Sequence, residues 1–160
     1  MSLRIGLGTD IHRLVEGRPC ILGGIELPHP TGPQGHSDGD AVLHALTDAI
    51  TGAAGLDDIG TLFPDDDPRW KDANSQALLS EAVRLVNGRG WRLVNVDVVI
   101  STEGPKIKPH RAAMRESLAR ILGVEIDQVN VKGKTLEGMT ELAGGRAVSV
   151  QAVCLLEARN

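Results

Sequence analysis

The chain has 160 residues, a formal net charge of −4 and 41% hydrophobic residues. These values predict a single globular domain over residues 1–160 that buries its own core without disulfides. The acidic balance argues against a protein that binds nucleic acid or a membrane surface, because those partners favour a basic excess. With one Phe, two Trp and no Tyr, the chain also has almost none of the aromatic stacking surface that binding of single-stranded nucleic acid requires.

The first residues alternate in hydrophobicity as a β-strand does. Leu3, Ile5 and Leu7 are separated by Arg or Gly, and the pattern runs out near Asp10 and His12. Asp10 and His12 are two positions apart, so both side chains would point to the same face of a strand that ends there. On its own, this pair is more typical of a surface hydrogen bond than of a binding site.

A short strand or hairpin is expected over residues 20–25, before a loop rich in Pro and Gly. The only cysteines are Cys20, in this strand, and Cys154, near the end of the chain. Their number and separation indicate buried, reduced thiols and a cytoplasmic protein. We also expect no membrane association, because the chain shows neither an apolar signal region nor a run of membrane-spanning length.

Residues 36–44 (HSDGDAVLH) combine metal-binding side chains, a hydroxyl and a helix start within nine positions. A helix is expected from about Asp40 to Ala54, capped by Asp38 or Ser37. Apolar residues fill one face of this helix. The other face carries two acids and a histidine at positions i, i+4 and i+8. Such a row of polar side chains usually faces water, and it could equally belong to a functional site. The members of this row are Asp40, His44 and Asp48.

The remaining elements follow from periodicity. We expect helices at about 75–87 and 109–122, and strands at 94–100, 129–132 and 148–157. This order predicts an α+β fold, with a sheet of roughly four main strands covered by helices on one face. The other face mixes polar and apolar residues, so we expect neighbouring subunits to pack against it. Its polar members are Asn95, Asp97, Ser149 and Gln151.

Asp10, His12 and His44 form a possible metal site. Three nitrogen and oxygen ligands suit Zn²⁺ and leave the fourth tetrahedral position open for substrate or water. Spacing does not show that the three residues meet, so a set of unrelated polar side chains stays open as the alternative.

Four lysines lie in two loops that each follow a predicted strand. In an acidic protein this concentration of positive charge suggests an anion site, phosphate above all, although ordinary exposed lysines are the alternative. Thr135 and Glu137 lie beside the second pair, and a carboxylate there could hold a Mg²⁺ that bridges phosphate oxygens. The chain has neither a Walker pattern nor a Gly-x-Gly-x-x-Gly fingerprint. The four lysines are Lys106, Lys108, Lys132 and Lys134.

Several segments, in this order, resemble the methylerythritol cyclodiphosphate synthase family of non-mevalonate isoprenoid biosynthesis. The similarity runs from residue 4 almost to the end, and the His-Ser-Asp-Gly-Asp run with the preceding Asp-x-His is its most specific feature. The segments are GLGTDIH at 6–12, HSDGD at 36–40 through HALTDA at 44–49, DIG at 58–60 with FPD at 63–65, and PK at 105–106 with PH at 109–110.

The resemblance implies a homotrimer with sites between neighbouring subunits and a cytidine-diphosphate-linked substrate. It implies that Asp10, His12 and His44 bind Zn²⁺ or a similar divalent transition metal, and that Glu137 binds Mg²⁺ or Mn²⁺. Asp40 and Asp48 are expected to support the site by orienting His44 or closing the loop. The implied catalytic residues are His36, Ser37, Thr135 and Glu137. The implied substrate- and nucleotide-binding residues are Asp58, Gly60, Asp65, Pro105, Lys106, Ile107 and Lys134.

The resemblance is poorest from Thr140 to Arg146. The family usually reads Gly-Phe-x-Gly-Arg-Gly-Glu-Gly there, whereas this chain has Glu141 in place of the Phe that lines the family's central cavity. Arg146 is also shifted from the family Arg, and Lys134, where the family often has Thr, offers a compensating charge.

The reaction implied is an intramolecular phosphoryl transfer. The 2-phosphate of 4-diphosphocytidyl-2-C-methylerythritol 2-phosphate attacks the β-phosphorus, which yields methylerythritol 2,4-cyclodiphosphate and CMP. Two alternatives stay open: a zinc phosphohydrolase that uses water as the nucleophile, and a catalytically weakened trimer that only binds metal and nucleotide.

Overall fold

The computed structural model describes residues 2–35, 37–64, 66–70, 74–139, 144 and 146–159. Its main sheet contains β1 (Leu3–Glu16), β4 (Thr31–Pro33), β5 (Trp91–Ser101), β6 (Val129–Lys134) and β7 (Ala147–Ala158), in the order β4-β1-β7-β5-β6. Of the strand pairings described in this sheet, β5–β6 is parallel and the others are antiparallel. A separate hairpin pairs β2 (Cys20–Leu22) with β3 (Ile25–Leu27).

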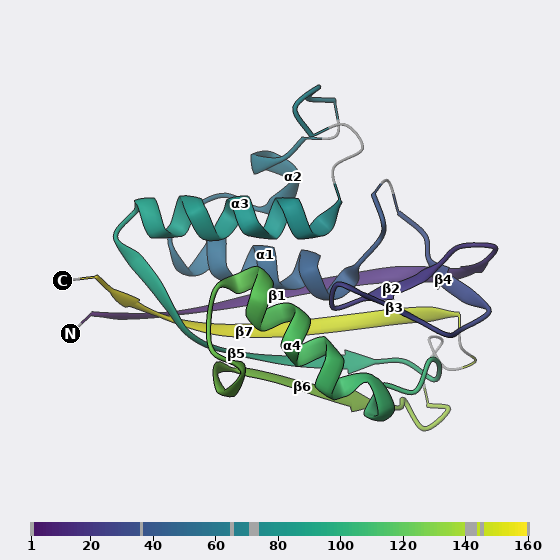
Figure 1. Ribbon diagram of the computed structural model, residues 1–160. Coiled ribbons are helices and arrows are strands. Elements are labelled where there is room, and N and C mark those ends of the chain that lie inside the picture. The colour runs from purple at the N-terminus through teal and green to yellow at the C-terminus, as the bar shows by residue number, and fades with distance from the viewer. Residues whose placement is uncertain are drawn as a thin grey trace.

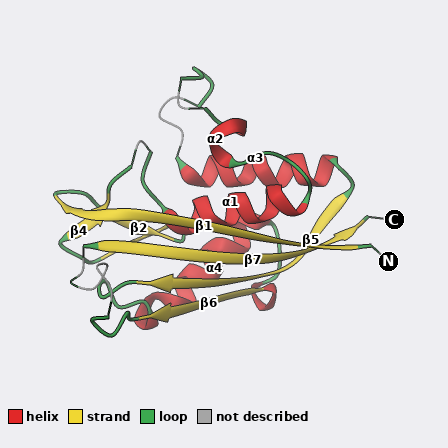
Figure 2. Ribbon diagram, turned by 180° about the vertical axis from the view of Figure 1, so that it is seen from behind, coloured by secondary structure: helices red, strands yellow, loops and turns green. Residues whose placement is uncertain are grey.

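The described helices lie on one side of the sheet, as the two opposite views show (Figures 1 and 2). They are α1 (Ala41–Ala53), α2 (Ile59–Leu62), α3 (Ser75–Gly88) and α4 (Arg111–Leu122), with short 3-10 turns η1 (Lys108–His110) and η2 (Ile126–Gln128). The prediction of an α+β fold with helices on one face is therefore confirmed. Among the described residues, no helix has both the length and the apolar character needed to cross a membrane.

Glycines in β1 allow α1 to lie directly on the sheet. A Cβ built on Gly6 or Gly8 would collide with the backbone carbonyl of Ala49 or Ala45 in α1. Side chains alternate along a strand, so Asp10 and His12 share this helix-facing side with the glycines. The close approach of α1 brings its first turns within side-chain reach of β1.

The other face of β1 carries four of its large apolar residues. Together with one residue of β7 they are 45% to 73% exposed in the single chain. The register places Ser149 and Gln151 of β7 opposite Ile11 and Thr9 on this face. The strand register places Leu7, Val153 and Asp97 side by side across three strands. This confirms the mixed character predicted for this face. The exposed apolar residues on it are Leu3, Ile5, Leu7, Ile11 and Val153.

Two predictions about the start of the chain were wrong. β1 does not end near His12 but runs to Glu16, because β4 and β7 both pair with its second half. The cap of α1 is Asp40 rather than Asp38 or Ser37: its carboxylate accepts hydrogen bonds from the amides of Val42 and Leu43.

Asp40 is also fully buried, so it does not belong to a water-facing row. Its carboxylate accepts from the amides of Gly23 and Gly24, at 2.9 and 2.7 Å, which ties the β2–β3 turn to the start of α1. Asp48 has a similar role later in α1, because it accepts from the amide of Ile59 at 2.8 Å and so holds α2 to α1. Both acids close loops, which is one of the two roles expected for them.

Candidate functional site

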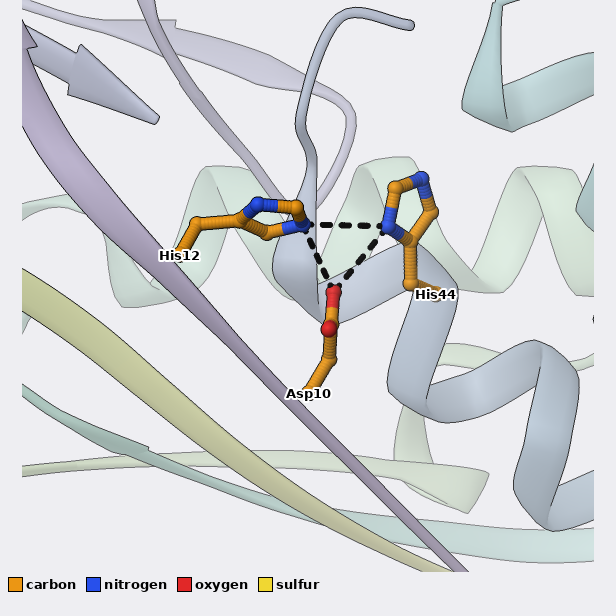
Figure 3. A group of neighbouring side chains, drawn as sticks. All are labelled: Asp10, His12 and His44. Carbon is orange, nitrogen blue, oxygen red and sulfur yellow. Dashed lines mark hydrogen bonds and ion pairs between the residues drawn. The ribbon is translucent and has the colours of Figure 1, made fainter. Parts of the chain in front are cut away.

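Three predicted ligands meet between β1 and α1. Asp10 and His12 project from β1 on its helix-facing side, and His44 reaches them from the first turns of α1 (Figure 3). One carboxylate oxygen, Asp10 Oδ2, lies 2.9 Å from His12 Nε2 and 3.0 Å from His44 Nδ1. The two ring nitrogens are 3.3 Å apart. All three side chains are partly exposed, so a ligand can reach the cluster from solvent.

The hydrogen bond on the far side of His12 shows which of its nitrogens is free. His12 Nδ1 lies 2.6 Å from the backbone carbonyl of Gln34. A carbonyl oxygen only accepts, so Nδ1 carries the hydrogen and a neutral ring presents the lone pair of Nε2 to Asp10. Lone pairs therefore converge in the cluster, which is the arrangement that a divalent cation satisfies.

Electrostatics agree with this arrangement. Burial alone would raise the pKa of the Asp10 carboxyl, but the contacts with His12 and His44, whose rings donate to this carboxylate when they are protonated, outweigh it and hold that pKa well below its ordinary value. The hydrogen bond to Asp10 raises the pKa of His12, against the effect of burial. The cluster attracts positive charge, and the nitrogen and oxygen donors fit a divalent metal.

A second group of predicted residues lines a cavity of about 390 Å³ at the carboxyl ends of β5 and β6. Five cationic side chains border it, and Glu103 is the one acid among the described residues of its lining, so the predicted concentration of positive charge is present. Lys132 is also paired with Asp97, 2.5 Å from Nζ to Oδ2. The predicted residues in this lining are Pro105, Lys106, Ile107, Lys108, Lys132, Lys134 and Thr135, and the further cation is Arg111.

The metal-competent cluster of Asp10, His12 and His44 thus lies between β1 and α1, and the cationic cavity lies at the ends of β5 and β6. The family model described as the YgbB family matches residues 3–157 of this sequence. The chain belongs to the YgbB family. The resemblance seen in the sequence motifs is thereby confirmed, since the related proteins below carry the name of that synthase.

The 2-C-methyl-D-erythritol 2,4-cyclodiphosphate synthase of Dechloromonas aromatica is 54% identical over 157 residues, which cover 98% of both chains. That of Chromobacterium violaceum is 54% identical over 153 residues, 96% of this chain and 97% of the relative. A solved structure of such a synthase, described as a CDP-bound form, matches with a TM-score of 0.90 and 47% identity, covering 96% of this chain and all of the other.

Other residues that the YgbB resemblance singled out fall at three places. Ser37 joins the metal-competent cluster, with its Oγ 3.3 Å from His44 Nε2. Asp58 and Gly60 lie at the start of α2, where the exposed Asp58 carboxylate accepts from the amide of Thr61 and its pKa is lowered by that residue's hydrogen bonds. Thr135 Oγ1 donates to Glu137 Oε1 at 2.5 Å.

Two of the expected site residues, His36 and Asp65, lie outside the described residues, as do positions 140–143 and 145 of the divergent segment. Arg146 is described, and its backbone carbonyl accepts from the amide of Leu14 at 2.8 Å.

Sequence reasoning missed two residues that shape the cluster. Arg18 donates from its guanidinium to the carbonyls of Gly35, at 3.3 Å, and Ser37, at 2.9 Å, and so holds the loop on either side of residue 36. Ser75 lies 2.9 Å from His44 Nε2. A lone Arg in a turn gives no signal of this kind, and Ser75 looks in the sequence like an ordinary residue at a helix start.

Proposed function

We propose that the chain is a 2-C-methyl-D-erythritol 2,4-cyclodiphosphate synthase of non-mevalonate isoprenoid biosynthesis. It converts 4-diphosphocytidyl-2-C-methylerythritol 2-phosphate into methylerythritol 2,4-cyclodiphosphate and CMP. An oxygen of the 2-phosphate forms a bond to the β-phosphorus, and the bond from that phosphorus to the bridging oxygen breaks. The observation that carries the proposal is the convergence of Asp10 Oδ2, His12 Nε2 and His44 Nδ1 in a chain of this family.

The nucleophile is already an anionic phosphate oxygen, so the site needs little general-base help. What it must do is hold two phosphate groups together and neutralise the charge that they share. Asp10, His12 and His44 would hold Zn²⁺ or a similar divalent transition metal, which supplies Lewis-acid stabilisation of charge on phosphate. The Ser37 hydroxyl, beside His44, donates to a phosphate oxygen, and His36 acts on the same group.

The cationic cavity is the proposed site of the cytidine diphosphate moiety. Its volume and positive lining support this role, as does the CDP-bound form of a related synthase. Pro105, Lys106 and Ile107 contact the cytidine, and Lys134 and Thr135 the phosphates. Glu137, next to Thr135, would hold Mg²⁺ or Mn²⁺, which would supply positive charge to neutralise the phosphates.

The methylerythritol moiety is assigned to the region of α2, which contacts α1 through the hydrogen bond from the Ile59 amide to Asp48, four residues after His44. Asp58 carries its carboxylate on the surface there, where it can accept hydrogen bonds from substrate hydroxyls. The residues proposed to bind this moiety are Asp58, Gly60 and Asp65.

We further propose a homotrimer whose active sites lie between subunits. The exposed apolar face of β1 and β7 supports it, because isolated chains rarely leave such a surface in water. The metal-competent cluster is on β1 and the cavity on β5 and β6, with β7 between them in the sheet. A neighbouring subunit would bring the cavity of one chain to the cluster of another.

The two buried, unpaired thiols, Cys20 and Cys154, support a cytoplasmic location.

The direct test is incubation of the purified protein with substrate, Zn²⁺ and Mg²⁺, followed by ³¹P NMR of the products. The proposal predicts equimolar CMP and cyclic diphosphate. Release of inorganic phosphate would instead identify a zinc phosphohydrolase. Binding of metal and nucleotide without any CMP would identify the catalytically weakened trimer, which the divergent segment at 140–146 leaves possible.

A further inference from the structure

The Ser75 hydroxyl links His44 to a second acid, Asp38. Ser75 is fully buried at the first position of α3, and its Oγ lies 2.9 Å from His44 Nε2 and 2.5 Å from Asp38 Oδ1. The backbone amide of Ser75 donates to the other oxygen of Asp38 at 3.0 Å. Asp38 Oδ1 also accepts from the amide of Asp40, at 3.1 Å. Asp38, Ser75 and His44 therefore form a continuous hydrogen-bonded chain that ends at the metal-competent cluster.

The number of hydrogens available determines which atom donates in each of these hydrogen bonds. A serine hydroxyl has one hydrogen to donate, and Asp38, which accepts from two backbone amides, takes it at the shorter distance. Ser75 Oγ must then accept from His44, so the hydrogen of a neutral His44 ring is on Nε2. Ser37 Oγ, 3.4 Å from Ser75 Oγ, can donate to Ser75 and does not need His44 as its acceptor.

We propose that Asp38 and Ser75 are positioning residues that hold His44 in its Nε2–H tautomer, so that Nδ1 presents a lone pair to the metal. The proposal rests on the metal centre of the proposed function and adds two residues to it. For His12 the Gln34 carbonyl has the same effect from the opposite nitrogen. In both rings, therefore, the nitrogen with the lone pair faces the metal position, and the groups that fix this orientation do not contact the cation.

Asp38 is needed because a serine hydroxyl can either donate a hydrogen bond to His44 or accept one from it. Without that acceptor, Ser75 could donate its hydrogen to His44 Nε2, which would move the ring hydrogen to Nδ1. There it would point at Asp10 Oδ2, 3.0 Å away, and occupy the position that the metal requires. Asp38→Asn should therefore weaken metal binding even though the substituted side chain contacts no metal ligand, because an amide cannot accept at both of its ends.

The test combines tautomer and affinity measurements. Long-range ¹⁵N–¹H spectra of metal-free protein labelled in its five histidines, recorded well above the ordinary histidine pKa, report which nitrogen of His44 carries the hydrogen. Competition with a chromogenic chelator gives the zinc affinity of wild type, Ser75→Ala and Asp38→Asn. Ser80→Ala is the matched control, since Ser80 is exposed on the same helix. Ser75→Thr, which keeps the hydroxyl, should restore binding.

We expect hydrogen on Nε2 of His44 in the wild type, and zinc affinity about 10- to 100-fold lower in Ser75→Ala and Asp38→Asn, with Ser80→Ala unchanged. Hydrogen on Nδ1 in the wild type, or wild-type affinity in both variants, would overturn the inference. If a variant fails to fold, the wild-type spectrum still decides. Wild-type protein that shows this tautomer and binds zinc but yields no cyclic diphosphate would contradict the proposed function alone.

Discussion

At the scale of single residues, groups outside the metal-competent cluster determine which ring nitrogen of each histidine carries the hydrogen. The Gln34 carbonyl holds the hydrogen of His12 on Nδ1, so that the opposite nitrogen turns its lone pair toward Asp10. Without a cation, a shared proton is the remaining way to relieve repulsion among these atoms, which is why the pKa of His12 rises and that of Asp10 falls. These three side chains would hold a divalent metal, which would relieve the same repulsion.

Removal of one metal ligand should abolish metal binding and leave the fold intact. In His44→Ala the carboxylate and the other imidazole remain, but two ligands hold zinc poorly. We expect turnover to fall at least about 100-fold, the size of effect seen when one electrostatic contact to a reacting group is lost. Circular dichroism should show an unchanged fold. A variant with full activity and no bound metal would contradict the role of the cluster.

Asp40 gives a stability prediction with a defined pH dependence. Burial raises its pKa to about 6, although hydrogen bonds from Gly24, Gly23 and Leu43 act the other way. An unfolded chain releases this proton near 3.8, so the folded protein binds more protons between the two values. The contribution of Asp40 to the free energy of unfolding is thus complete below about 3.8 and decreases as the pH rises to about 6.

We therefore expect Asp40→Asn to lower the free energy of unfolding by about 1–3 kcal/mol, because buried amide hydrogens lose an acceptor. Urea unfolding at several pH values should show the gap from wild type narrowing between about pH 4 and 6. Asp127→Asn, at an exposed position, is the control. A gap that widens with pH would show that the buried carboxylate is stabilised in its charged form.

At the scale of elements, the contact of α1 with β1 decides whether His44 reaches its partners. Gly8→Ala would place a methyl group against the backbone of α1 at Ala45. We expect it to lower stability by about 1–3 kcal/mol through overpacking and to weaken zinc binding, since α1 must move away from Asp10. Denaturant unfolding and chelator competition measure the two effects.

The matched control is Gly52→Ala, in the exposed face of α1, where a Cβ meets no atom within 4 Å. It should raise stability by about 0.5–1 kcal/mol, as alanine does when it replaces glycine within a helix. Equal effects of the two substitutions would show that the close approach at Gly8 does not limit the position of α1.

Much of this architecture could be predicted because its periodicity is local. The limits of α3 and the end of α4 at Gly123 follow from patterns within the segments themselves. The burial of Asp40 could not be predicted, because it depends on glycine amides of the β2–β3 turn, far away in sequence. Nor could the true end of β1, which is set by pairing with β4.

For the site, the spacing of Asp10 and His12 predicted a shared face, and ligand chemistry grouped them with His44 as a possible metal site. Spacing could not show that the three residues meet, and the family resemblance supplied that expectation. The role of Ser75 could not be predicted from the sequence, because serine is common at the start of a helix. Its role arises from tertiary contacts with Asp38 and His44. The extent of the domain, residues 1–160, stays a prediction.

At the scale of the whole molecule, the exposed apolar face should govern assembly. Ile5 is 73% exposed in the single chain, and a charge at this position would be buried without a partner in the proposed trimer. We expect Ile5→Asp to sediment as a monomer and to lose activity while the wild type sediments as a trimer. Ile126→Asp, which removes an exposed apolar residue in η2, should leave assembly intact. A monomeric wild type would refute the trimer.

The proposed chemistry depends on one cation held by three side chains from β1 and α1. Crystals soaked in zinc, with anomalous diffraction recorded on both sides of the zinc absorption edge, test it most directly. We predict one peak about 2.0–2.2 Å from each of Asp10 Oδ2, His12 Nε2 and His44 Nδ1. A map with no peak between these atoms, or with zinc bound only elsewhere, would contradict it.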